Sequence, residues 1–113
     1  KVQGKKEQGA DKIILDAKAL ENAGVFSIVL EMVPSKLAKT ITKNINIPTI
    51  GIGAGPHTSG QVLVYHDVLG LNPGFKPKFL RTYLNGYESI KNALNHYSNE
   101  VKNGSFPSKK ESF

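Results

Sequence analysis

The sequence predicts an α/β fold built around a small parallel β-sheet, and three observations support this prediction. Helix-like and strand-like segments alternate along the first half of the chain. The strand-like segments are short apolar runs bounded by glycine or proline, a pattern typical of strands buried in a parallel sheet. The segments on either side of the first strand-like run carry apolar residues at helical spacing. Alternation of helices and strands favours a parallel order of the strands.

Two helices are predicted in this half of the chain. The first runs from about Ala10 to Leu20, because its apolar side chains recur three and four residues apart. Gly24 follows it as a typical helix stop. The second runs over residues 35–44. The residues expected on its inner side are Leu37, Ala38, Ile41 and Ile45.

Three strands are predicted, at Phe26–Leu30, Thr49–Ile52 and Val62–Tyr65. The first is expected to be buried on both faces, as strands of parallel sheets usually are. Pro34 follows it and suits the first turn of the next helix, where the missing N–H is not needed.

The second half of the chain is predicted to contain fewer regular elements. Residues 70–78 are rich in proline and glycine and are expected to form a loop, followed by a short helix at Phe79–Leu84. A longer helix is predicted at Ser89–Val101, with Gly104 as its stop. The polar tail, residues 105–113, is expected to be loosely held.

Composition excludes several classes of protein. A chain of 113 residues holds one domain at most, and the absence of cysteine excludes disulfides, thiolate metal sites and a cysteine nucleophile. No apolar run approaches the roughly 20 residues that span a bilayer, so no membrane association is expected. The net charge of +6 would steer polyanions, yet no basic run is interleaved with aromatic residues, and nucleic acid is not an expected partner. Because the chain opens on Lys1, we expect it to begin inside a larger protein.

Glu31 is the candidate functional residue. It follows the first predicted strand directly and precedes the helix that begins near Pro34. In α/β folds the carboxyl ends of parallel strands are where ligands bind and chemistry is done. A carboxylate near a helix N-terminus is also favourable for capping alone. Position by itself leaves the two interpretations open.

The glycine-rich run Gly51–Pro56 does not fit a dinucleotide-binding fingerprint. That motif needs a third glycine three positions after the second, where a helix opens, and Pro56 occupies this position. The glycines would allow either close approach of backbone to a ligand or positive φ angles in a tight turn.

His57, His66 and Asp67 lack the spacing of a metal site. Both histidines are expected to be structural, hydrogen-bonded groups. Asp67, at the end of the third predicted strand, is a more interesting candidate than the histidines, and it could also simply cap the loop that follows it. We therefore predict no metal ligand in this chain.

Five sequence blocks carry a family resemblance, and it extends from Lys1 almost to Phe113. The blocks are Lys1–Gly4, Val29–Pro34, Ile47–Gly55, Gly60–Asp67 and Pro73–Phe79. In this order they resemble the ketopantoate hydroxymethyltransferase (3-methyl-2-oxobutanoate hydroxymethyltransferase) family. The resemblance implies that residues 1–113 are the carboxyl-terminal portion of a single (β/α)8 TIM-barrel domain. The three predicted strands would be barrel strands six to eight, and residues 89–101 the closing helix.

The resemblance also implies a reaction. The family transfers a hydroxymethyl group from 5,10-methylenetetrahydrofolate to 3-methyl-2-oxobutanoate, giving ketopantoate (2-dehydropantoate) in pantothenate and coenzyme A biosynthesis. The glutamate of its Val-Leu-Glu-x-Val-Pro block is the general base and falls on Glu31. The family's Mg²⁺ ligands belong to the first half of the barrel, outside this chain. By the same resemblance we expect a cytoplasmic homo-oligomer, often a decamer, and an isolated chain that is inactive.

One departure and two alternatives remain. Relatives often end in Glu-Glu-His-Ser-Phe, whereas this chain ends in Lys109–Phe113 with two lysines, which puts any role of that tail in doubt. One alternative is another 2-oxo-acid barrel enzyme, of the phosphoenolpyruvate mutase or isocitrate lyase type. The other is a non-catalytic segment that acts only by associating with a partner.

Overall fold

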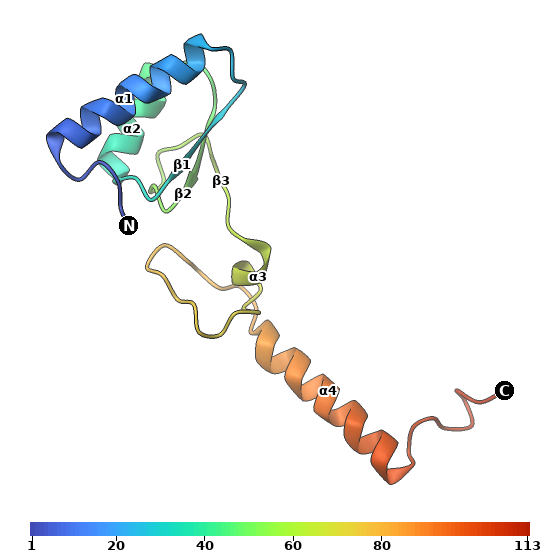
Figure 1. Ribbon diagram of the computed structural model, residues 1–113. Coiled ribbons are helices and arrows are strands. Elements are labelled where there is room, and N and C mark those ends of the chain that lie inside the picture. The colour runs from blue at the N-terminus through green and yellow to red at the C-terminus, as the bar shows by residue number, and fades with distance from the viewer. The chain divides into compact units, whose positions relative to one another are not determined.

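The chain forms two compact units. A computed structural model describes all of residues 1–113. The first unit comprises Lys1–Val64 with Pro77–Leu80, and the second comprises Tyr65–Lys76 with Arg81–Phe113. Figure 1 shows the elements of both units.

The first unit is a three-stranded parallel sheet with two helices on one of its faces (Figure 1). Its elements in chain order are α1 (Glu7–Asn22), β1 (Ile28–Glu31), α2 (Ser35–Asn44), β2 (Thr49–Ile52) and β3 (Gly60–Gln61). The strands lie in the order β1-β2-β3, and both pairings are parallel. The predicted α/β class with a parallel sheet is therefore confirmed.

The core lies between the two helices and one face of the sheet. The inner residues predicted for α2 are all buried there, together with Ala17 of α1 and Ile28 and Leu30 of β1. The opposite face of β1 is open, and its Val29 is 60% exposed. The expectation that this strand is buried on both faces is thus wrong for this chain. The reason is that helices cover only one side of the sheet.

Two boundaries of the first unit differ from prediction by a few residues. Helix α1 begins at Glu7, one turn before the predicted start, with an acidic side chain in its first turn. The first strand begins at Ile28 instead of Phe26, because the Ile28 amide is the first to bond toward β2, donating to the Pro48 carbonyl at 3.0 Å. Helix α2 has the predicted bounds, although Pro34 is its N-cap and not a residue of its first turn.

The third strand is displaced from its predicted position. Only Gly60 and Gln61 pair with β2. The last hydrogen bond between the two segments runs from the Val62 amide to the Gly51 carbonyl of β2, at 3.0 Å. Beyond this bond, residues 62–64 make no pairing in the sheet, and Tyr65 already begins helix α3 (Tyr65–Val68). The prediction of a strand at Val62–Tyr65 is therefore wrong, because apolar character alone supplies no neighbour to pair with.

The second unit consists of α3, α4 (Gly86–Asn103) and the segments around them. Helix α4 confirms the predicted long helix, and Gly104 ends it at a φ of 78°. The predicted helix at Phe79–Leu84 is absent. Amides near its end instead bond to carbonyls of α3 and its C-terminal flank, and the Tyr83 amide reaches the Val68 carbonyl at 2.8 Å.

The polar tail contains one hydrogen-bonded turn. The Ser108 amide donates to the Glu111 carboxylate at 2.8 Å. The Ser108 side chain and then its amide lower the pKa of Glu111, because both hydrogen bonds favour the ionised form. All residues after Gly104 are exposed.

Candidate active site

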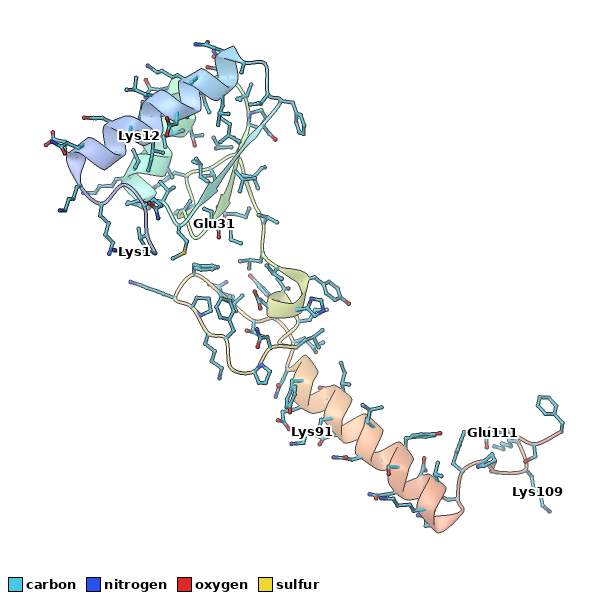
Figure 2. All side chains as sticks on the ribbon, in the orientation of Figure 1. Lys1, Lys12, Glu31, Lys91, Lys109 and Glu111 are labelled. Carbon is cyan, nitrogen blue, oxygen red and sulfur yellow. The ribbon has the colours of Figure 1, made fainter.

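Glu31 is the last residue of β1, at the carboxyl end of the parallel strands, as predicted (Figure 2). Successive side chains of a strand point to opposite faces. Because Ile28 and Leu30 face the helices, Val29 and Glu31 face the open side of the sheet. This geometry follows from the sequence, because Glu31 comes two residues after Val29 and therefore shares its face of the strand.

The carboxylate of Glu31 is free of partners in this chain. The two ion pairs are Lys12–Asp16 and His96–Glu100, and no side chain makes a capping hydrogen bond at the N-terminus of α2. The structure therefore does not support capping by a Glu31 hydrogen bond, one of the two interpretations of this residue. A carboxylate without internal partners is available to a ligand.

Glu31 also lines a groove of about 530 Å³ that runs beside β1 in the first unit. One wall is α1 and the other is β1. The Lys12–Asp16 ion pair belongs to the α1 wall, and much of the remaining lining is apolar. The residues of the lining are Gln3, Gly4, Gly9, Lys12, Ile13, Asp16, Ala17, Leu20, Ile28, Val29, Leu30, Glu31 and Val33.

The open face of the sheet places aliphatic side chains around Glu31. In the register of β1 and β2, Glu31 lies opposite Ile52, and Val29 lies opposite Ile50. Side chains directly opposite each other in neighbouring strands share a face and are in contact range. A carboxylate therefore stands beside an apolar surface that could contact the hydrocarbon part of a small ligand.

The turn after β1 is a feature that sequence analysis missed. Met32 has a φ of 54° and is the one residue other than glycine with a positive φ. Its amide donates to the Ile52 carbonyl at 2.9 Å, and its carbonyl accepts from the Gln3 amide at 2.8 Å. Methionine carries no preference for left-handed backbone, so nothing in the sequence signals this turn.

The glycine-rich run after β2 serves turn geometry. Gly53 and Gly55 have φ values of 65° and 77°. A Cβ on Gly55 would collide with the side chain of Ser35 at the start of α2. One of the two alternatives for this run, positive φ in a tight turn, is thus confirmed. The other, a wall of a ligand pocket, stays a prediction, and these glycines do not line the groove beside β1.

The remaining candidates lie elsewhere. His57 is exposed in the loop before β3, and neither it nor His66 makes a side-chain hydrogen bond within the chain, so their expected structural role is not supported. His66 is exposed in α3, with its ring edge-on to Tyr65 at 5.4 Å. Asp67 accepts from the Gly70 amide through its backbone carbonyl and not through its side chain.

Two properties of the whole chain bear on its partners. No three side chains of histidine, aspartate or glutamate gather into a group that could hold a metal ion. None of the helices combines the length and the apolar character needed to cross a membrane.

Comparison with known proteins identifies close relatives. The chain is 59% identical over its full length to 3-methyl-2-oxobutanoate hydroxymethyltransferase of Bdellovibrio bacteriovorus and 57% identical to the enzyme of the same name from Thermosipho africanus. It is 58% identical over 107 residues to that of Coxiella burnetii, a match that covers 95% of the chain.

The chain is shorter than these relatives. It spans 43% of the length of the first two and 40% of the third. The model of the family described as ketopantoate hydroxymethyltransferase matches residues 1–109, nearly the entire chain. The chain belongs to the ketopantoate hydroxymethyltransferase family.

Proposed function

We propose that this chain is the carboxyl-terminal portion of an enzyme that transfers a hydroxymethyl group from 5,10-methylenetetrahydrofolate to 3-methyl-2-oxobutanoate, giving ketopantoate for pantothenate and coenzyme A biosynthesis. The observation that carries the proposal is Glu31, an unpaired carboxylate at the carboxyl end of a parallel strand. It stands beside the aliphatic side chain of Ile52 on the open face of the sheet. The names of the relatives supply the reaction class.

Glu31 acts in this proposal as the general base. Its carboxylate removes the proton from the carbon next to the keto group of the substrate, and the electron pair of that bond forms an enolate. The enolate carbon then forms a bond to the one-carbon unit of the folate. Both carbon–nitrogen bonds that hold this unit in the folate break, and water supplies the hydroxyl group. The two folate nitrogens gain the proton that Glu31 removed and one proton from water, so the products are ketopantoate and tetrahydrofolate.

The apolar neighbours of Glu31 would orient the substrate. Ile52 lies opposite Glu31 across the β1–β2 pair, and Val29 and Ile50 lie on the same face toward the amino ends of the strands. These aliphatic side chains suit the branched hydrocarbon end of 3-methyl-2-oxobutanoate, and contact with them excludes water from the reacting carbon.

A metal ion belongs to the proposed enzyme but not to this chain. The residues present do not form a ligand set for a metal ion. We assign the Mg²⁺ ligands to the part of the relatives' length that the chain does not span. A bound divalent cation would take up negative charge on the enolate oxygen.

The fold proposal is that β1, β2 and β3 are strands six, seven and eight of a TIM barrel formed by a single domain. Three features support it: parallel order, helices on one face only, and an opposite face that carries exposed Val29 and Val62. A barrel needs such an arrangement, with helices outside and side chains filling the interior. Assembly into a cytoplasmic homo-oligomer, with the decamer as the expected form, rests on the family resemblance alone.

Replacement of the base tests the proposal. In the full-length enzyme that carries this chain, Glu31→Gln keeps the size of the side chain and removes its capacity to accept the proton. We expect the rate of deuterium uptake at the carbon next to the keto group, followed by NMR in D2O, to fall by about 10²-fold or more. Ketopantoate formation should fall in parallel.

Glu7→Gln is the matched control, because Glu7 is an exposed residue in the first turn of α1. It should leave both rates unchanged. Deuterium uptake at the parental rate in Glu31→Gln would rule out Glu31 as the base.

A further inference from the structure

The backbone immediately after Glu31 is strained. Met32 has a left-handed φ of 54°, a conformation that is unfavourable for residues with a side chain. The neighbouring strand ends in the same way, since Gly53 directly follows β2 with a φ of 65°. Glycine adopts that angle without steric cost. A methionine at the equivalent position of β1 therefore calls for a physical reason.

Hydrogen bonds fix the turn on both sides of Met32. The amide continues the β1–β2 ladder by donating to the Ile52 carbonyl at 2.9 Å. The carbonyl accepts from the Gln3 amide at 2.8 Å, in the segment before α1. The peptide groups on either side of Met32 are thus both held, and the residue between them must take the left-handed angle.

The side chain of Met32 has a defined seat. Its sulfur lies 3.2 Å from the position that a Cβ on Gly53 would take, and Cδ1 of Phe79 lies 3.1 Å from the same position. The side chains of Met32 and Phe79 therefore both lie beside Gly53, in space that a side chain at position 53 would occupy. Met32 itself is half-buried. A flexible thioether is well suited to fill a gap of this irregular shape.

We propose that Met32 is a positioning residue for Glu31. Its side chain, seated on Gly53 beside Phe79, holds the strained turn in one conformation and so fixes the direction in which the preceding carboxylate points. Strained backbone of this kind is maintained where the surrounding contacts determine it, and it is frequent at active sites. The inference rests on the proposed role of Glu31 as the base.

The test separates positioning from simple packing. In the full-length enzyme, Met32→Gly retains the left-handed turn without strain and removes the seated side chain, whereas Met32→Leu retains an apolar side chain of similar volume. We expect Met32→Gly to lower kcat and the rate of deuterium uptake by about tenfold, because small misplacements of a catalytic group are costly. The KM for 3-methyl-2-oxobutanoate and the thermal midpoint should stay at the parental values.

Two further variants complete the design. Met32→Leu should restore kcat to within about twofold of the parent, since it refills the seat. Phe79→Leu loosens the same seat from the other side and should reproduce a loss in kcat without a change in KM. It also supplies the measurement if Met32→Gly does not yield folded enzyme.

The outcomes distinguish this inference from the proposed function. Parental kcat in both Met32→Gly and Phe79→Leu, with Glu31→Gln inactive, would overturn the positioning role alone. A fall in kcat matched by a rise in KM and a lower thermal midpoint would assign Met32 to packing and also overturn it. An active Glu31→Gln would remove the base, and the positioning role with it.

Discussion

Single residues with left-handed backbone shape the carboxyl edge of the sheet. Gly53 and Gly55 lie in the turn after β2, and Met32 lies in the turn after β1. Gly55 approaches the first turn of α2 so closely that the Cα of Ser35 would lie 3.1 Å from an added Cβ. The absence of a side chain at Gly55 is therefore what allows the β2 loop and the start of α2 to pack beside the strand that carries Glu31.

Gly55→Ala should destabilise the enzyme. Alanine would adopt a left-handed φ and would meet the Ser35 side chain, and together these effects should lower the free energy of unfolding by about 2 kcal/mol or more. Denaturant unfolding of the full-length protein measures the change. Gly24→Ala is the matched control, because Gly24 has a φ of 88° but open space around it. It should cost only about 1 kcal/mol. Equal losses in the two variants would contradict the steric argument.

Hydroxyl groups join the elements of the first unit at the amino end of β2. Thr49 is fully buried, and its Oγ1 lies 2.8 Å from Oγ1 of Thr42 in α2. Because the Thr42 hydroxyl donates to the Ala38 carbonyl, the Thr49 hydroxyl is the donor between the two threonines. Thr49 Oγ1 in turn accepts from the Ser59 amide at 3.2 Å, just before β3. One side chain thus connects a helix, a strand and a loop.

Thr49→Val should weaken these connections while keeping the shape of the side chain. The Ser59 amide would lose an acceptor and the Thr42 hydroxyl would lose a donor, and we expect the free energy of unfolding to fall by about 1–3 kcal/mol. Thr40→Val serves as the control, because Thr40 is exposed and bonds only within α2. Its effect should stay within about 0.5 kcal/mol. An unchanged midpoint of urea unfolding for Thr49→Val would show that the hydroxyl contacts contribute nothing net.

The first unit as a whole leaves one face of its sheet open, and the outer edges of β1 and β3 are both unpaired. The amides of Ile28 and Met32 bond toward β2, and in a parallel strand alternate residues bond to opposite sides. The amides of Val29 and Glu31 therefore point to the free edge of β1, along the groove beside α1. Free edges with apolar neighbours favour pairing with a further strand.

At this scale we predict that activity requires the part of the relatives' length that the chain does not span. The chain alone should bind no catalytic metal and form no ketopantoate, and it should fold poorly because of its open edge and face. Mixing it with a separately expressed amino-terminal portion of the Bdellovibrio relative should restore activity, measured as ketopantoate formed. The amino-terminal portion alone is the control. Normal activity of the 113-residue chain by itself would contradict the assignment of roles.

The sequence was most informative where a local pattern and its surroundings agree. Helix α2 has its predicted bounds and inner residues, because its apolar spacing matches the side that packs on the sheet. Gly104 ends α4 as predicted, since the left-handed cap is a local property of the backbone. The position of Glu31 at the carboxyl end of a parallel strand was also predicted correctly. The strand-like run ends directly before Glu31, and Pro34 and a helix follow it, so the local sequence fixes this position.

The predictions that failed depended on partners distant in the sequence. Residues 62–64 have strand-like composition, but after the bond of the Val62 amide they have no strand to pair with. The segment at Phe79–Leu84 turns instead of forming a helix. Burial of β1 was overestimated because the apolar run does not reveal how many layers cover the sheet. The left-handed turn at Met32 likewise depends on Gln3, Ile52, Gly53 and Phe79, none of which adjoins it in the chain.

By itself, then, the sequence determined the α/β class, the positions of the three longer helices and the single carboxylate at the end of the first strand, because these follow from periodicity and local backbone preference. Only the tertiary structure decided which face of β1 is open, where β3 pairs and how the chain turns after Glu31. Those features are set by hydrogen bonds and contacts between segments far apart in the chain, which no local pattern encodes.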